Sequence, residues 1–304
     1  MQKHAFLIMA HNNFEVLEKL LLCLDNSNID FFLHIDKKSY YDASMIKKQL
    51  KYSSLFTLSP MKIYWADYTQ VKCELRLLEA AFNQSKYDYF HIMSGSDLPL
   101  KPVQSILNFF EVNKGKEFIQ FHNFKSAKKT EYWILRYHIF SKKISTSKNR
   151  HTLFLYKLLN KTSLIIQQVF HIEKFKPKNY VLCKGANWVS ITKEATKYII
   201  KQKPLIKNLF NKSRSPDEYF IQSILYNSPF KKNIYNAKFD DNYESCQRFI
   251  DWKRGNPYVF KKDDYDTLIS SNFLFARKFQ YTTDSDIVNY IYNKNIQNEQ
   301  FFKK

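Results

Sequence analysis

Three short apolar runs, separated by stretches with helical spacing, dominate the first hundred residues of the chain. The runs cover residues 4–10, 29–35 and 87–93, and the helical patterns cover residues 13–25, 42–50 and 69–83. Such alternation is typical of a mainly parallel sheet with helices packed on its faces. The sequence therefore predicts an α/β fold, to which residues 62–64 are expected to add a short strand.

Regular patterning is interrupted in the middle of the chain and then returns. Residues 113–178 are basic and less periodic, and a mobile loop is expected at residues 145–150. Later segments are expected to be strands at 180–183 and 187–191 and helices at 193–202, 216–226 and after Asp284. No internal repeat or linker separates these parts, so a single merged domain is expected.

Polar residues follow three of the predicted strands at the points where the strands end. His11 follows residues 4–10, Asp36 follows residues 29–35, and Asp97 lies in the turn after residues 87–93. Because the carboxyl ends of parallel strands meet at one edge of a sheet, ligands bind there. This placement predicts a nucleotide-type site that includes His11, Asp36 and Asp97.

The tetrapeptide at residues 215–218 has the pattern of a helix start. Ser215 is expected to cap the helix, and Pro216 suits its first turn. Asp217 and Glu218 would then lie where the helix dipole favours anions, so they are expected to stay ionised near neutral pH. A carboxylate of that kind can serve as a general base, although an ordinary helix start has the same pattern.

Aromatic and cationic side chains occur in several other segments with polar neighbours. The candidates are Trp65, Lys184, Asn187, Trp188, Trp252, Arg254, Arg277 and Lys278. Tryptophan rings stack on sugar rings, and cations on apolar segments suit a leaving diphosphate; a packed tryptophan is the alternative. Only four glycines are present, and Gly95, Gly185 and Gly255 lie in the segments that carry candidate residues. A chain with few glycines tends to keep those that its backbone geometry demands.

The net charge is +20 and unevenly distributed. Residues 114–178 contain 15 Lys and Arg against three acids, so they contribute +12 of it. Such a segment suits an anionic partner, which could be a nucleotide, a nucleic acid or an acidic membrane surface. A solvated surface in a Lys-rich chain is the alternative.

The four cysteines are widely spaced and form no CxxC pair. This argues against a zinc site or a disulfide framework and fits a reducing cytoplasm. No apolar run reaches the length of about 18 residues that a membrane-spanning helix needs, and no secretory signal is expected from residues 5–10. The acidic pairs Asp264/Asp266 and Asp284/Asp286 lie beside helical patterning, where helix capping is expected in preference to metal binding.

Six segments, taken in order, resemble the core-2/I-branching β-1,6-N-acetylglucosaminyltransferase family, which also contains the peptide xylosyltransferases. They are HIDKKS from residue 34, WADYTQV from 65, YFHIMSGSDLPLK from 89, KGANW from 184, SPDE from 215 and FLFARKF from 273. The resemblance covers roughly residues 4 to 290 and is weakest over 113–178. It implies a GT-A type fold in one merged domain, 1–304, with a nucleotide-sugar half at 1–112, a basic insert at 113–178 and an acceptor and catalytic half at 179–304.

The resemblance also implies roles for individual residues. Glu218 would be the general base. His11, Asp36, Trp65, Ser96 and Asp97 would lie on the donor side, with Asp36 at the uridine and Ser96 and Asp97 at the sugar or ribose. Lys278 would neutralise the diphosphate with an arginine partner, for which Arg254 is the candidate and Arg277 the alternative. The acceptor side would include Lys184, Asn187, Trp188, Asp217 and Trp252.

The expected activity is inverting transfer from a UDP-sugar to a glycan or lipid-linked saccharide hydroxyl, without a divalent metal or other cofactor. N-acetylglucosamine is the first expectation for the donor, and xylose, glucose and galactose remain open. The chain resembles bacterial members that make capsule or lipopolysaccharide precursors in the cytoplasm. Our hypothesis is that its basic middle segment holds the enzyme near acidic lipids at the inner face of the plasma membrane or near an anionic, lipid-linked acceptor. A basic nucleic-acid- or membrane-binding protein without catalysis is the alternative of a different class, but no nucleic-acid motif is present.

Overall fold

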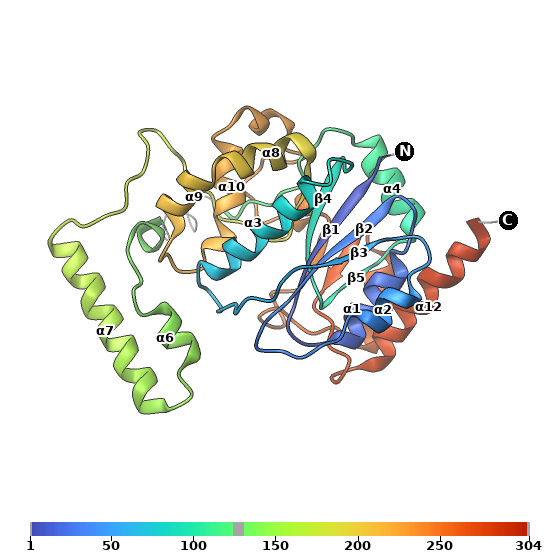
Figure 1. The fold of residues 1–304 in the computed structure, drawn as a ribbon, viewed down its shortest axis with the longest axis horizontal. Coiled ribbons are helices and arrows are strands. Elements are labelled where there is room, and N and C mark those ends of the chain that lie inside the picture. The colour runs from blue at the N-terminus through green and yellow to red at the C-terminus, as the bar shows by residue number, and fades with distance from the viewer. Residues whose placement is uncertain (1, 124–130, 303–304) are drawn as a thin grey trace.

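The computed structural model describes residues 2–123 and 131–302, and it shows an α/β protein with a mainly parallel central sheet (Figure 1). The strands of this sheet run in the order β3-β2-β1-β4-β6. Their bounds are β1 His4–Ala10, β2 Ile29–Ile35, β3 Leu55–Thr57, β4 Tyr89–Ser94 and β6 Ser190–Thr192. The first four pair in parallel, and β6 pairs antiparallel with β4. The predicted α/β class with a mainly parallel central sheet is therefore confirmed.

Helices cover both faces of this sheet (Figure 1). The helices are α1 Phe14–Cys23, α2 Ser44–Gln49, α3 Thr69–Phe82, α4 Val103–Val112, α8 Lys193–Lys201, α9 Lys203–Phe210, α10 Phe220–Tyr226, α11 Tyr265–Ser270 and α12 Ser285–Phe302. Alternate side chains of β1 enter different cores, because successive side chains of a strand point to opposite faces. Ala5 and Leu7 pack in the core under α3 and α8, whereas Phe6 and Ile8 pack in the core under α1 and α12.

A second, smaller sheet lies beside the carboxyl end of β4. It has the order β5-β8-β7, with β5 Asp97–Pro99, β7 Arg248–Ile250 and β8 Phe275–Arg277. Arg248 is fully buried and donates from Nη1 to Ser190 Oγ at 2.9 Å and from Nη2 to the Val189 carbonyl at 3.2 Å. This side chain joins β7 to the segment of β6, so the two sheets are fastened together and β8 is held near the strand ends of the main sheet.

Two of the strand predictions are wrong, and a third strand is shorter than predicted. Residues 62–64 form no strand, because Leu55–Thr57 occupies the sheet edge beside β2, while Met61 donates to His34 Nε2 at 3.0 Å. Residues 180–183 form no strand either, since their amides donate to the side chains of Asn227 and Ser223. The strand expected at 187–191 is observed as Ser190–Thr192.

The middle of the chain, which was expected to be less periodic with a mobile loop at residues 145–150, contains the helices α6 and α7 among its described residues. These are α6 Ser141–Thr146 and the 20-residue α7 Arg150–Val169, and Asn149 caps α7 by accepting from the His151 amide at 2.8 Å. Figure 1 shows the two helices as a hairpin that projects from one end of the molecule, opposite α12. Part of the basic segment, residues 124–130, lies outside the described residues.

Four short 3-10 turns complete the described elements: η1 Pro216–Glu218, η2 Pro229–Asn233, η3 Tyr243–Cys246 and η4 Lys262–Asp264. All four cysteines are buried. Within residues 2–123 and 131–302, no helix has both the length and the apolar character that crossing a bilayer requires.

Gly185 provides a test of how closely two segments must approach. A Cβ at this position would lie 1.8 Å from the Gln120 carbonyl oxygen, so Gly185→Ala should lower the free energy of unfolding by about 3 kcal/mol. Gly115→Ala is the control, because Gly115 has φ +81° but open space around it and should cost about 1 kcal/mol. Urea denaturation measures the free energy of unfolding of both variants. Equal losses of stability would show that the close approach to Gln120 is not what makes Gly185 necessary.

Candidate active site

Local structure fixes the position of Asp97, one of the predicted site residues. It lies in β5 rather than in an open turn, and it is buried. Its carboxylate accepts from the Ser94 amide at 2.9 Å and from Ser94 Oγ at 2.7 Å. Because Asp97 pairs in register with Arg277 of β8, the two side chains are brought together, with Arg277 Nη1 3.7 Å from Asp97 Oδ1.

Arg277 is held against an aromatic ring and lacks a full set of hydrogen bonds. Its guanidinium lies 3.9 Å from the centroid of the Trp188 ring. Its Nη1 is buried and, among the described residues, has no hydrogen-bond partner, since Asp97 is too distant for one. Burial lowers the pKa of Arg277. An anion with acceptor oxygens would satisfy this nitrogen.

Lys278 extends the positive region around Arg277, and His11 borders this region. Burial and the neighbouring Arg277 charge lower the pKa of Lys278. Burial and the positive charge of Lys278 lower the pKa of His11, so His11 is neutral at physiological pH. The backbone fixes this contact region, because the Phe279 amide donates to the Ser96 carbonyl at 2.9 Å.

Ser96 and Asp36 are held at the same strand ends. Ser96 Oγ accepts from Asn13 Nδ2 at 2.9 Å. The Asp36 amide donates to the Ala10 carbonyl at 2.9 Å, which places Asp36 beside His11. The Asp36 carboxylate accepts from the Lys38 amide at 2.9 Å and lies 3.3 Å from Lys38 Nζ. The structure therefore places His11, Asp36 and Ser96 at the carboxyl ends of β1, β2 and β4, the edge of the sheet to which the strand-end argument assigned His11, Asp36 and Asp97.

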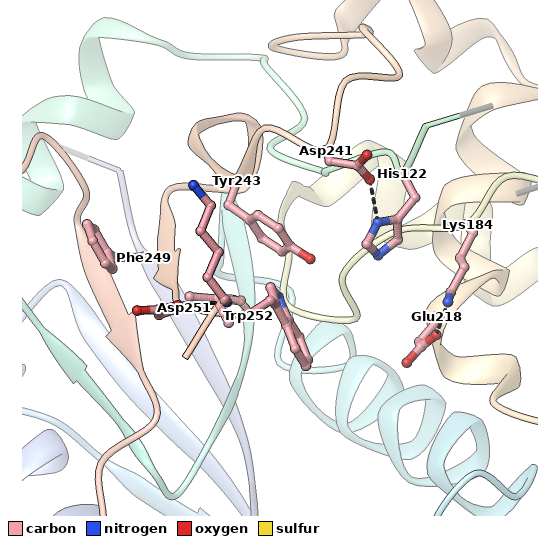
Figure 2. A pocket seen from close by; sticks show the side chains of 10 residues that line it. His122, Lys184, Glu218, Asp241, Tyr243, Phe249, Asp251 and Trp252 are labelled. Carbon is pink, nitrogen blue, oxygen red and sulfur yellow. Dashed lines mark hydrogen bonds and ion pairs between the residues drawn. The ribbon is translucent and has the colours of Figure 1, made fainter. Parts of the chain in front are cut away.

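Glu218 lies at a cavity of about 690 Å³. Its carboxylate is 3.1 Å from Lys184 Nζ, and its side chain is 37% exposed. Figure 2 shows Lys184 and Glu218 on one side of this cavity, with Trp252 and Tyr243 reaching towards its centre. The cavity therefore combines a carboxylate with aromatic surfaces, which is a suitable lining for a hydroxylated ring.

The cavity also contains a histidine–carboxylate pair that sequence reasoning missed. His122 Nδ1 and Asp241 Oδ1 are 2.7 Å apart (Figure 2), and Tyr243 adjoins them in the lining. No local pattern identifies this pair, because its members are 119 residues apart in the sequence. An isolated β-bridge between Phe121 and Phe239 brings the two loops together.

The local structure around residues 215–218 differs from the expected helix start. Ser215 has left-handed backbone angles, φ 49° and ψ 49°, and its side chain makes no capping bond. Residues Pro216–Glu218 form a 3-10 turn, and the α-helix begins at Phe220. The expectation that Ser215 caps the helix is therefore wrong. The turn also directs the two acids differently, because Asp217 is buried while Glu218 lines the cavity.

Asp217 is buried, which disfavours the ionised form that was expected for it at neutral pH. Burial, with the nearby Glu218 charge, raises the pKa of Asp217 to about 7. Its Oδ2 accepts from Gln70 Nε2 at 2.9 Å and from Asn187 Nδ2 at 3.2 Å. Near it lies Glu74 of α3, which sequence reasoning also missed. Burial and the Asp217 charge raise the pKa of Glu74 well above its ordinary value.

Arg254 and Trp65 are placed differently from the strand-end cluster. Arg254 is held by two acids, with Nε 2.5 Å from Asp251 and Nη1 2.6 Å from Asp264. Trp65 is 74% exposed. Its neighbour Ala66 accepts from the Ser215 amide at 3.0 Å, so the Trp65 segment adjoins the turn that carries Glu218.

One member of each acidic pair near the C-terminus accepts a hydrogen bond at the start of a helical segment. Asp284 accepts from the Ile287 amide at 3.1 Å at the start of α12, and Asp264 accepts from the Lys261 amide at 2.8 Å. Among the described residues, no three His, Cys, Asp or Glu side chains form a group that could hold a metal ion.

Comparison with known proteins identifies the class to which this chain belongs. Residues 4–268 match the sequence profile described as Core-2/I-Branching enzyme. Xylosyltransferase 2 of Rattus norvegicus is 21% identical over 93% of this chain and 32% of its own length. The human β-1,3-galactosyl-O-glycosyl-glycoprotein β-1,6-N-acetylglucosaminyltransferase is 20% identical over 92% of this chain and 66% of its own length.

The chain spans about a third of the xylosyltransferases that it matches, including sqv-6 of Caenorhabditis elegans, which is 23% identical over 85% of this chain. The solved structure of S. aureus TarS 1–349 aligns over 40% of this chain and 35% of the TarS chain. The sequence identity is 10% and the TM-score is 0.27, so the similarity is weak. These findings define a member of a glycosyltransferase family. The chain belongs to the Core-2/I-branching enzyme family, as its motifs indicate.

Asp217 makes stability depend on pH. In the folded protein its pKa is about 7, against an ordinary value of 3.8, so between these values the folded protein keeps a proton that the unfolded chain has lost. The free energy of unfolding of the wild type should therefore fall relative to that of Asp217→Asn, by about 1 kcal/mol per pH unit, as pH rises through this range. Urea denaturation across the range measures the difference.

Asp266→Asn is the matched control, because Asp266 is exposed on α11. Its stability should follow that of the wild type at every pH. If the Asp217→Asn protein also ran parallel to the wild type, Asp217 would not be the group that holds the proton.

Proposed function

We propose that the chain is an inverting, metal-independent glycosyltransferase of GT-A type that moves a sugar from a UDP-sugar to a hydroxyl of a glycan. The observation that carries the proposal is the buried Arg277 guanidinium, which has an unsatisfied nitrogen and lies beside Lys278. A diphosphate supplies the oxygens and the negative charge that this pair lacks. Glu218 lies at the adjoining cavity, where an acceptor hydroxyl would be deprotonated.

On the donor side, Arg277 and Lys278 would bind the diphosphate. Asp36 would accept a hydrogen bond from the uridine, and neutral His11 would border the nucleotide without adding charge. Ser96 and Asp97 would lie against the ribose or the transferred sugar. Trp65, with its exposed ring, completes the donor-side residues in this proposal.

The arginine that partners Lys278 is, in this proposal, Arg277 rather than Arg254. Asp251 and Asp264 already form ion pairs with the Arg254 guanidinium, so a diphosphate would have to displace their carboxylates. Arg277 faces one carboxylate at a distance too long for a hydrogen bond. The free hydrogen-bonding capacity therefore favours Arg277.

On the acceptor side, Lys184, Trp252 and the His122–Asp241 pair would contact the sugar ring in the cavity. Asn187 and Asp217 are bonded to each other, so they would shape the floor beside Glu218. Trp188 is covered by Arg277, which places it between the donor and acceptor sides. An acceptor bound here would lie next to the leaving diphosphate.

The reaction then follows from the placement of one base and two cations. Glu218 takes the proton of the acceptor hydroxyl, and the oxygen forms a bond to C1 of the donor sugar. The bond from C1 to the diphosphate breaks on the opposite face, and its electron pair leaves with UDP. Arg277 and Lys278 stabilise the charge that develops there, so direct displacement inverts the configuration at C1 without a protein nucleophile.

The names of the relatives point to two donor sugars but do not decide between them. They include xylosyltransferases and an N-acetylglucosaminyltransferase, and N-acetylglucosamine is our first candidate, followed by xylose, glucose and galactose. We further propose that residues 1–112 contribute the nucleotide half, 179–304 the acceptor half, and 113–178 a basic insert. The proposed setting is cytoplasmic synthesis of a bacterial surface polysaccharide.

Glu218→Gln tests the base. UDP release from a panel of UDP-sugars with EDTA present should occur with one donor for the wild type and should fall by about a hundredfold or more for the variant, because the amide cannot accept the proton. Glu194→Gln removes an exposed acid on α8 and should leave the rate unchanged. Loss of wild-type activity in EDTA would contradict the metal-independent mechanism.

Arg277→Gln and Arg254→Gln form a matched pair that tests the diphosphate site. Titration calorimetry with UDP should show affinity lower by about tenfold to a hundredfold for Arg277→Gln, because a charge-assisted bond in a buried site is lost. Arg254→Gln should keep the wild-type affinity. The reverse ranking would assign the diphosphate to Arg254.

A further inference from the structure

The helix α7 has one face that packs on the protein and another that does not. Leu164 and Gln167 are buried, and Leu153, Tyr156 and Asn160 are partly buried. These residues recur at intervals of three and four, so they lie along one side of the helix. The opposite side faces away from the body of the molecule, as the projecting position of α7 in Figure 1 indicates.

The outward side of α7 is apolar. Phe154, Leu158, Ile165 and Val169 form a row along it and are at least half exposed. A second exposed row adjoins it and consists of Leu155, Leu159 and Ile166. In a water-exposed helix this side would be polar, so the pattern indicates a surface that is covered by something apolar.

Cations border the apolar rows on one flank. Arg150, Lys157 and Lys161 are spaced seven and four residues apart, so they form a line along α7, and all three are exposed. The sequence contains no acidic residue between Glu131 and Glu173. These two acids are themselves occupied, since Glu131 pairs with Lys176 at 2.5 Å and Glu173 with Arg136 at 2.9 Å.

We propose that α7 docks the protein on a membrane surface that contains anionic lipids. The helix would lie in the plane of the interface, with its apolar rows among the upper acyl chains and its line of cations at the lipid phosphates. A second copy of the chain is a poorer occupant, because it would bring another line of cations against the first with no acid nearby. The inference goes beyond the proposed function, since docking requires no sugar transfer.

The hairpin is fastened to the loop that leads to Glu218. Gln167 accepts from the Tyr137 amide at 2.7 Å and donates to its carbonyl at 3.0 Å. The adjoining His138 amide donates to the Lys212 carbonyl at 2.7 Å, and Lys174 Nζ, which is buried, donates to Ser213 Oγ at 2.5 Å. Membrane docking would therefore hold residues 212–218, and with them the proposed base, near the lipid surface.

Vesicle flotation of the full chain tests the proposal. The protein should float with vesicles of phosphatidylcholine that contain one third phosphatidylglycerol and should stay behind with phosphatidylcholine alone. Lys157→Glu/Lys161→Glu should weaken binding by about tenfold or more. Lys47→Glu/Lys48→Glu on α2 makes the same change in net charge away from the hairpin and should bind within about twofold of the wild type.

The apolar rows are tested separately. Phe154→Glu/Leu158→Glu should abolish flotation, whereas Val112→Glu, at an exposed position of α4, should not. All of these side chains are exposed, and thermal unfolding midpoints close to that of the wild type establish that the variants fold.

Three results would overturn the proposal. Equal losses for the two charge-reversal pairs would mean that net charge alone attracts the protein to lipid. Flotation by Phe154→Glu/Leu158→Glu at the wild-type level would mean that the apolar rows are not inserted, as would be the case for a nucleic-acid site. A concentration-dependent dimer that this variant loses, without vesicle binding by the wild type, would assign the face to a second copy.

Discussion

The carboxylate of Asp97 is the interaction on which the arrangement of the site depends. It closes the end of β4 by accepting from Ser94, and the ladder between β5 and β8 sets Arg277 opposite it. Arg277 in turn covers Trp188, whose neighbour Asn187 bonds to Asp217. A continuous series of contacts therefore runs from the main sheet to the turn that carries Glu218.

Two adjacent carboxylates illustrate how environment separates chemical roles. Asp217 is buried behind Gln70 and Asn187, and its pKa is raised to about 7, whereas the Glu218 side chain reaches the cavity and pairs with Lys184. Neighbouring acids in unlike surroundings are typical of sites in which one carboxylate acts on a ligand and the other supports it. Adjacent residues of a 3-10 turn point about 120° apart, so Asp217 faces the interior while Glu218 faces the cavity.

Sequence reasoning was most reliable where burial is complete. Strands β1 and β2 were predicted because a parallel strand covered on both faces is a continuous apolar run, and their polar ends led directly to His11 and Asp36. It failed for β7 and β8, which have three residues each and carry no periodic signal, and for α7, whose apolar rows face outwards. The His122–Asp241 pair depends on loop geometry, and the burial of Asp217 depends on Glu74 and Gln70 of α3, so neither could be deduced from local pattern.

The burial of the four native cysteines determines how the surface of this protein responds to thiol chemistry. Burial raises the pKa values of Cys73, Cys183 and Cys246, and a thiol that is both inaccessible and protonated reacts slowly with maleimides or oxidants. A cysteine introduced at an exposed position would therefore be modified ahead of the native ones. A fluorescent or spin label can thus be attached to a single chosen helix without first replacing any of the chain's own thiols.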